Sequence, residues 1–297
     1  MKRGIFPGWR IVALTFCAQY MGWGLVGWAF ALFVMPMEAD LGWGREALSL
    51  GVSLRLAMAG LVSPLVGSLM DRRGGARLVV IVGGLIGGLA TVLLGAIDQL
   101  WQYYLLFGVV GGLATSATFD MLGPVVVPKW FVRRRGLALA LTNLGPPMAG
   151  VTMAPAINFS LSYWGWRTTW VAIGIATWLL VVPLAAWCLH RRPEDIGLQP
   201  DGDTSPDEPG RQPTAADASL SAKAIVRSPV VWLLVVALAS HGLASSALSV
   251  HRVPLLIGRG FSQSYATTVL FFNGLLSIVL KVPWGYLGDR YPLRRLL

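Results

Sequence analysis

Charged residues are scarce in this chain. They make up 13% of its 297 residues, whereas a soluble domain usually carries about a quarter. Cysteine is also rare: Cys17 and Cys188 both lie inside apolar stretches, at a spacing that fits neither a disulfide framework nor a metal site. No glycine-rich run contains the GKS or GKT of a phosphate-binding loop, and no loop carries a nucleophile with a base. These absences argue against a soluble domain, a nucleotide-driven pump and an enzyme, and the sequence predicts no metal or other cofactor.

Apolar residues, in contrast, make up 55% of the chain, and its mean hydropathy is +0.63. They gather in blocks long enough to cross a bilayer as α-helix, for which about 20 residues are needed. We expect eight membrane-spanning helices, at residues 11–36, 47–70, 78–97, 101–128, 136–162, 168–190, 229–250 and 264–287. The predicted fold is therefore that of an all-α integral membrane protein.

Basic residues are distributed unevenly between alternate loops. With the N-terminus in the cytoplasm, most of the 24 lysines and arginines fall in cytoplasmic segments, for example in 129–135 and 191–192. This asymmetry follows the positive-inside rule. The net charge of +10 is therefore a signal of topology rather than of a nucleic-acid partner. We expect a multi-pass protein of the cell (inner or plasma) membrane with a cytoplasmic N-terminus.

One stretch differs from the rest in composition. Residues 191–227 are rich in Pro, Asp, Gly and Ser and contain few large apolar side chains, so this segment cannot bury enough surface to fold alone. We expect it to be a cytoplasmic linker. It divides the chain into a six-helix transmembrane bundle (1–190) and the start of a second transmembrane bundle (228–297).

An internal repeat supports this division. GSLMDRRGGARLV (67–79) and GYLGDRYPLRRLL (285–297) each follow the second helix of a bundle. They match, at a constant offset, at Gly67 and Gly285, Leu69 and Leu287, Asp71 and Asp289, Arg72 and Arg290, Arg77 and Arg295, and Leu78 and Leu296. Two similar bundles are typical of secondary transporters. Because few residues follow Asp289, we expect the second bundle to stop after two helices, as in a fragment or a truncated gene product.

The first copy of the repeat resembles the signature of the major facilitator superfamily between helices two and three. Five residues match this signature: Gly67, Asp71, Arg72, Gly74 and Arg77. In the second copy, Pro292 replaces the second glycine. Within the superfamily, the chain is similar to the monocarboxylate-transporter-like and oxalate/formate-antiporter-like branch in PGWRIV (7–12), LGWGREALSL (41–50), KWFVRRRGLALAL (129–141) and RRPEDIGLQPDG (191–202).

The resemblance implies a twelve-helix major facilitator fold, of which this chain would supply eight helices. It also implies that the repeated loop residues latch the two bundles together at the cytoplasmic side. This conformational latch would consist of Gly67, Asp71, Arg72, Gly74, Arg77, Gly285, Asp289 and Arg290. A carboxylate is stabilised near a helix N-terminus, and an arginine can bridge to carbonyls or acids. The alternative is that the arginines only enforce topology.

Three charged residues inside the spans are candidates for substrate binding, because burying a charge in a membrane is costly. Lys281 matches the point of helix eight at which monocarboxylate transporters hold an arginine that faces the substrate carboxylate. The acid that the family often places one turn earlier is here Ser277, which leaves proton coupling through that pair open. Lys281 could instead snorkel to the interface. Arg55 either faces a cavity or snorkels outward, and Asp120 is either a protonation site or a packing partner.

Polar residues in the spans complete the set of substrate-binding candidates. They are Gln19, Tyr20, Asn143, Asn273 and His241. His241 could relay protons, because an imidazole titrates near neutral pH, or it could make a structural hydrogen bond to a neighbouring helix.

Together these features predict a secondary active transporter of small organic anions, of the monocarboxylate kind, that works by alternating access. Coupling would be to protons or to a counter-substrate, because no ATP motif is present. The partners expected are the organic anion, protons if transport is proton-coupled, and the lipid bilayer, with no nucleic acid. Two alternatives remain open: a facilitator for another substrate class, such as a drug or a sugar, and a non-transporting membrane sensor or remnant.

Overall fold

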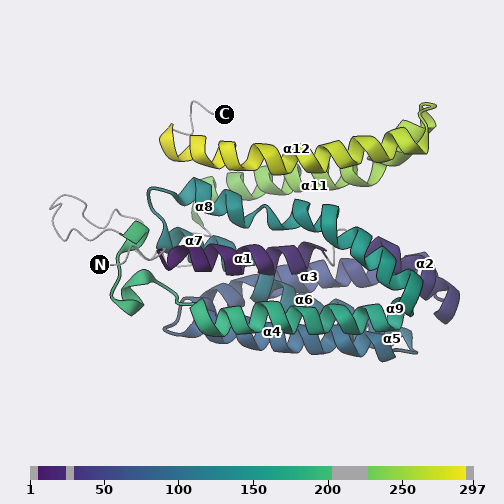
Figure 1. The fold of residues 1–297 in the computed structure, drawn as a ribbon, viewed down its shortest axis with the longest axis horizontal. Coiled ribbons are helices and arrows are strands. Elements are labelled where there is room, and N and C mark those ends of the chain that lie inside the picture. Colours follow the sequence, from purple (N-terminus) through teal and green to yellow (C-terminus); the bar gives the residue numbers. More distant parts are fainter. Residues whose placement is uncertain (1–5, 25–29, 203–226, 292–297) are drawn as a thin grey trace. The chain divides into compact units, whose positions relative to one another are not determined.

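The computed structural model describes residues 6–24, 30–202 and 227–291. All regular secondary structure in these residues is helical (Figure 1), and this confirms the predicted all-α fold. The chain forms two compact units, residues 1–203 with 274–297 and residues 204–273. The predicted linker (191–227) lies mostly outside the described residues, as do the repeat positions Pro292, Arg295 and Leu296. The division into two bundles therefore stays a prediction.

The first three predicted spans all fall on helices. The helices are α1 (Gly8–Trp23), α2 (Phe30–Leu41), α3 (Arg45–Met70) and α4 (Gly75–Leu93), which continues into the short turn η2 (Leu94–Ala96). Gly74 precedes α4 with a φ of 73°, a conformation that residues with a Cβ rarely adopt. The second glycine of the repeated loop is therefore needed to start this helix.

The fourth span is one continuous helical stretch from Leu100 to Trp130. Its parts are α5 (Leu100–Tyr103), η3 (Tyr104–Val110), α6 (Gly111–Thr115), η4 (Ser116–Asp120) and α7 (Leu122–Trp130). The segments η3 and η4 are π-helical, a local widening that often occurs at functional sites. They lie along α3 and α4 within the first unit.

The next two helices are α8 (Arg135–Thr142) and α9 (Gly145–Cys188). The fifth predicted span covers α8 and the first part of α9, and the sixth covers the second part of α9. Helix α9 folds back on itself at Gly165 (Figure 1), whose φ of 75° and ψ of 172° are essentially restricted to glycine. A hydrogen bond of 2.8 Å between the hydroxyls of Ser160 and Thr169 joins the two halves. The outer connection that the sequence predicts between residues 162 and 168 is thus reduced to a single non-helical residue.

The remaining described elements follow α9. They are the short turns η5 (Pro193–Ile196) and η6 (Pro200–Gly202) and the long helices α11 (Pro229–Gly258) and α12 (Gln263–Arg290). These two helices contain the seventh and eighth predicted spans.

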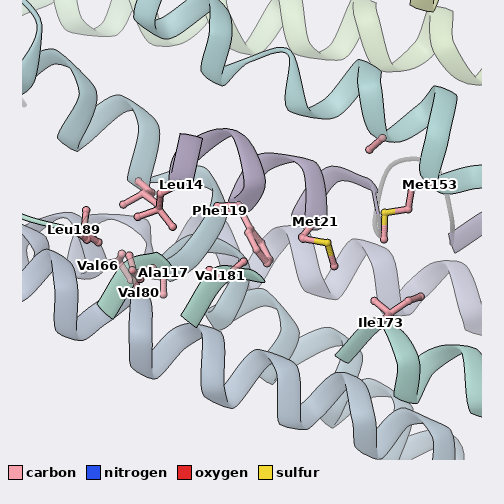
Figure 2. Close-up of a cluster of buried hydrophobic side chains, with 14 of the residues drawn as sticks. Leu14, Met21, Val66, Val80, Ala117, Phe119, Met153, Ile173, Val181 and Leu189 are labelled. Carbon is pink, nitrogen blue, oxygen red and sulfur yellow. The ribbon is translucent and has the colours of Figure 1, made fainter. Parts of the chain in front are cut away.

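The core of the first unit contains buried side chains from α1, α4 and η4, among other elements. Figure 2 shows Leu14 and Met21 of α1 beside Phe119 of η4 and Val80 of α4, and all four side chains are buried. At Gly22 an added Cβ would lie 2.3 Å from the ring of Phe119, so the two helices approach closely there. In lipid this close packing, rather than the exclusion of water, holds helices together.

Four helical stretches in the described part of the chain are long and apolar enough to cross a membrane. They are Arg45–Met70, Gly75–Ala96, Leu100–Trp130 and Arg135–Cys188, the last of which contains two predicted spans. Large apolar side chains remain exposed along them, for example Leu61 and Leu65 of α3 and Leu78 of α4. Exposed apolar surface of this extent fits contact with lipid.

Candidate functional site

The clearest arrangement of the predicted site residues is between α12 and α8. The carboxylate of Asp289, near the end of α12, accepts hydrogen bonds from the backbone N–H groups of Gly136 and Leu137, at 2.5 and 2.9 Å. These amides belong to the first turn of α8, where helical N–H groups lack intrahelical partners. The negative carboxylate is also favoured by the positive end of the helix dipole. Asp289 thus caps a helix that lies 152 or more residues earlier in the chain.

Lys281 contacts the opposite end of α8. Its ammonium Nζ donates a hydrogen bond of 2.7 Å to the backbone carbonyl of Asn143, the residue that follows the helix. A cation is favoured at this negative end of the dipole. The side-chain amide of Asn143 is engaged separately, since its Nδ2 donates to the carbonyl of Leu139 at 2.9 Å. Lys281 is half-buried, so it is turned towards another helix rather than fully towards the membrane interface.

Gly285 lies between these two contacts and permits the helices to approach. A Cβ added to Gly285 would lie 2.4 Å from the Cβ of Ala140 and 2.6 Å from the carbonyl oxygen of Gly136. The pairs 281 with 143, 285 with 140 and 289 with 136 define an antiparallel register over the whole length of α8. A glycine is therefore required by packing at Gly285.

The first copy of the repeated loop makes different contacts. Asp71 forms an ion pair of 2.6 Å with Lys129, at the end of α7, and its carboxylate is 66% exposed. The backbone carbonyl of Asp71 accepts a hydrogen bond from the guanidinium of Arg191, and Arg77 donates to the carbonyl of Ala186. These described contacts all lie within residues 1–203, and they tie the loop to α7, to the end of α9 and to the first residue of the predicted linker.

The remaining members of the predicted latch are on the surface. Arg72 is exposed, and the guanidinium of Arg290 lies 4.7 Å from the centre of the Tyr286 ring on its own helix. An added Cβ at Gly67 would meet no atom within 4 Å, so packing does not require glycine at that position as it does at Gly285.

Arg55 is buried inside the first unit, with 3% of its surface exposed. Its Nε donates to the hydroxyl of Thr115 at 3.1 Å, and its guanidinium lies 4.8 Å from the centre of the Phe107 ring. An added Cβ at Gly111 would lie 2.6 Å from its Nη1, so that glycine makes room for the cation. Of the two positions predicted for Arg55, the outward snorkelling one is therefore wrong: the side chain lies between α3 and the stretch from η3 to α6.

Asp120 ends the π-helical segment η4 and is half-buried. It interacts electrostatically with Arg55, but among the described ion pairs none joins the two residues. Arg55 instead donates hydrogen bonds to the hydroxyl of Thr115 and to the backbone carbonyl of Phe107.

Two candidates on α1 pack against the start of α9. The hydroxyl of Tyr20 makes a hydrogen bond of 2.8 Å with Thr152. Gln19 is 7% exposed, and its Oε1 has no hydrogen-bond partner in the described part of the chain. A Cβ at Gly145 would lie 3.0 Å from the Cβ of Gln19. Gln19 lies near Gly145, at the start of α9, and Lys281 contacts Asn143, at the end of α8, so both residues lie near the junction of these two helices.

The last two candidates belong to the second compact unit, residues 204–273. His241 is exposed, and its Nε2 lies 3.5 Å from the hydroxyl of Ser245 one turn along the same helix, α11. Asn273 is exposed on α12. Among the described residues no cluster of three or more His, Cys, Asp or Glu side chains that could hold a metal ion is present.

Sequence reasoning missed three groups of contacts. Lys129 was not predicted as the partner of Asp71, nor the α8 backbone as the partner of Asp289 and Lys281. Thr15 of α1 and Thr142 of α8 share a buried hydrogen bond of 2.9 Å. These pairs join distant parts of the chain, and a backbone carbonyl or amide leaves no signal in a sequence.

Comparison with known proteins adds an independent line of evidence. The family model of the Major Facilitator Superfamily matches residues 12–297. Monocarboxylate transporter 11 of Homo sapiens is 30% identical over 294 residues, which is 98% of this chain and 58% of that protein. Monocarboxylate transporter 13 of Bos taurus is 25% identical over 287 residues, covering 96% and 62%. The MFS-type transporter YcxA of Bacillus subtilis is 26% identical over 187 residues, covering 62% and 45%. The chain thus spans about three fifths of the length of the monocarboxylate transporters it matches.

Proposed function

Because the chain belongs to the Major Facilitator Superfamily, a family of multi-pass membrane transporters rather than enzymes, we propose that it acts in secondary transport of small organic anions across the cell membrane, by alternating access. The monocarboxylate transporters among its relatives support this substrate class. The positive-inside pattern supports a cytoplasmic N-terminus.

The observation that carries the proposal is the position of Lys281. Its ammonium lies in a predicted span, half-buried, and its described partner is a neutral carbonyl, that of Asn143. A substrate carboxylate would be a stronger partner, because it adds the attraction between opposite charges to the hydrogen bond. We therefore assign substrate recognition to Lys281, which lies beside Asn143.

This exchange of partners connects binding to movement. When Lys281 turns from the α8 carbonyl to a substrate carboxylate, one of the two charged contacts between α8 and α12 is lost. Asp289 then holds the start of α8 alone. Such a change weakens the state in which α8 and α12 are packed together, and differential stability of this kind is what lets a ligand shift a conformational equilibrium.

Proton coupling and exchange both remain candidates for the driving force. Ser277, one turn before Lys281, cannot titrate as an acid there. Proton coupling would therefore use another group in the spans, for which we propose Asp120, a half-buried carboxylate. Without such a group, transport is exchange of one anion for another.

The protein reconstituted in proteoliposomes tests this function through uptake of labelled pyruvate. We expect saturable uptake, a fall of about tenfold or more in Lys281→Gln, and substantial recovery in Lys281→Arg, which keeps the charge. An inwardly directed proton gradient, or an anion loaded inside, separates symport from exchange. Uptake of a drug or a sugar in place of the anion, or no uptake by folded protein, would instead support the alternative substrate classes or a non-transporting role.

A further inference from the structure

A second carboxylate, that of Asp201 in the segment that follows α9, accepts hydrogen bonds from backbone amides close to α8. Asp201 lies in the short turn η6, where its Oδ2 accepts hydrogen bonds from the backbone N–H groups of Val132 and Arg133, at 2.9 and 2.8 Å. These two amides belong to the α7–α8 turn, residues 131–134. The contact joins residues 68 and 69 positions apart, so it fixes the start of the predicted linker to the first unit.

The backbone of Asp201 shows that this contact is specific. Its φ of 59° and ψ of 2° lie in the left-handed region, and it is the one residue other than glycine with a positive φ in the described part of the chain. Most residues with a Cβ avoid this region, and aspartate and asparagine are among the few that enter it more readily. The two hydrogen bonds of the carboxylate hold Asp201 in this conformation. A glycine would adopt the same backbone without strain but would lack the carboxylate.

The α7–α8 turn is itself firmly attached to the first unit. Phe131 is 1% exposed, and its ring lies 4.9 Å from that of Trp9 and 5.6 Å from that of Phe6. The guanidinium of Arg135 donates to the carbonyls of Pro128 and Phe131, at 3.2 and 3.3 Å. The turn is therefore the fixed partner, and Asp201 with its segment is the part that is held.

The same short stretch of backbone serves both carboxylates. Asp201 uses the amides of Val132 and Arg133, and Asp289 uses those of Gly136 and Leu137, three residues farther along. We propose that Asp201 is a positioning residue: it docks the start of the linker on the α7–α8 turn and thereby holds the first turn of α8 where Asp289 can reach it. The docking stands on geometry alone, whereas its effect on transport rests on the proposed function.

Chemical labelling tests the docking without any substrate. A cysteine at Leu198, a half-buried position three residues before Asp201, reports whether the segment is attached; Cys17 and Cys188 lie in predicted spans and give the background in the parent protein. We expect a polar maleimide to label Leu198→Cys about fivefold faster when combined with Asp201→Gly, which removes the carboxylate but suits the backbone. Asp195→Asn is the matched control, because Asp195 contacts only Arg191 and Arg192 among the described pairs. Equal labelling with and without Asp201→Gly, or equal acceleration by Asp195→Asn, would overturn the docking.

Transport tests the second half of the proposal. We expect Asp201→Gly to lower the maximal rate of pyruvate uptake about fivefold with an unchanged KM, since Asp201 does not touch the substrate. Combined with Asp289→Asn, it should add little further loss, because residues that act through one element are not additive. The link to Asp289 would be overturned if the double variant lost the product of the two single-variant losses in maximal rate. It would also be overturned if Asp201→Gly left the maximal rate unchanged. If the unaltered protein takes up no anion, the proposed function fails, and the labelling rates still decide the docking.

Discussion

Lys281 and Asp289 lie about two helical turns apart on α12 and contact opposite ends of α8, the ammonium at its last carbonyls and the carboxylate at its first amides. The spacing fits, because eight residues of α-helix are about 12 Å long on either helix. Each charge meets the end of the dipole that favours it, by about 0.3–1 kcal/mol for one exposed contact and more where the site is partly buried. Both residues contact backbone groups of α8 rather than charged side chains. Because the two ends of α8 carry opposite partial charges, the two contacts favour one direction of α12 relative to α8.

The close approach at Gly285 gives a prediction with an internal control. Gly285→Ala places a methyl group against the Cβ of Ala140 and the carbonyl of Gly136, which costs about 1–3 kcal/mol in overpacking and forces α12 away from α8. We expect a cysteine at Leu137, in the first turn of α8, to react faster with a maleimide, and uptake of anion to fall. Gly288→Ala, on the same helix, meets no atom within 4 Å and should change neither. Equal behaviour of the two variants would mean that α8 and α12 do not pack in this register.

The burial of Arg55 predicts that replacing it destabilises the protein more than replacing Arg45, an exposed arginine of the same helix. Arg55→Ala removes a buried side chain that packs on Phe107 and bonds to Thr115. We expect a loss of about 2 kcal/mol, or a fall in Tm of about 5 °C for detergent-solubilised protein. Arg45→Ala removes an exposed ion pair with Glu38 and should cost well under 1 kcal/mol. If Arg55→Ala melts at the same temperature as the unaltered protein, the prediction is wrong and the buried guanidinium makes no net contribution to stability. An effect of this variant on uptake would then have to come from a function of Arg55 in transport.

The helices were predictable because each apolar block had to satisfy its own backbone in lipid. The predicted span 47–70 and the observed Arg45–Met70 differ by two residues at one end. The reversal at Gly165 was not predictable in detail, because residues 162–168 contain aromatic and small residues that continue a helix as readily as they end it. One glycine conformation decided it.

The candidate site was predictable only in its charged members. Lys281 and Asp289 stood out because charges are rare in these stretches, whereas their partners are backbone groups of α8 that any sequence would offer. Asp201 belongs to a PDG triplet that, from sequence, indicates no more than a turn. Its function as an anchor depends on the α7–α8 turn, which lies almost 70 residues earlier.

The ion pair of Asp71 and Lys129 allows a test of how Asp71 acts in the first loop, through Lys129 or through another contact made during transport. The carboxylate is mostly exposed, so breaking the pair should cost less than about 1 kcal/mol and leave membrane insertion intact. If Asp71 acts in transport by holding Lys129, then Asp71→Asn and Lys129→Gln should slow uptake equally. If Asp71 instead reaches another helix during the cycle, Asp71→Asn alone should slow it. Unchanged uptake in Asp71→Asn, at normal amounts of protein in the membrane, would remove Asp71 from the proposed latch.

The two ends of α8 should act together, and a double-mutant cycle measures this. Lys281→Gln and Asp289→Asn each leave the other contact in place, so we expect each to raise the labelling rate of a cysteine at Leu137 only about threefold. The double variant releases both ends, and the helix then has no charged contact with α12; we expect a coupling of at least about 0.5 kcal/mol beyond the two single effects. Arg290→Gln is the matched control, because Arg290 follows Asp289 directly but stacks on Tyr286 of its own helix. Independent effects would show that α12 holds α8 at two separate points, and that binding of an anion at Lys281 does not loosen the contact at Asp289.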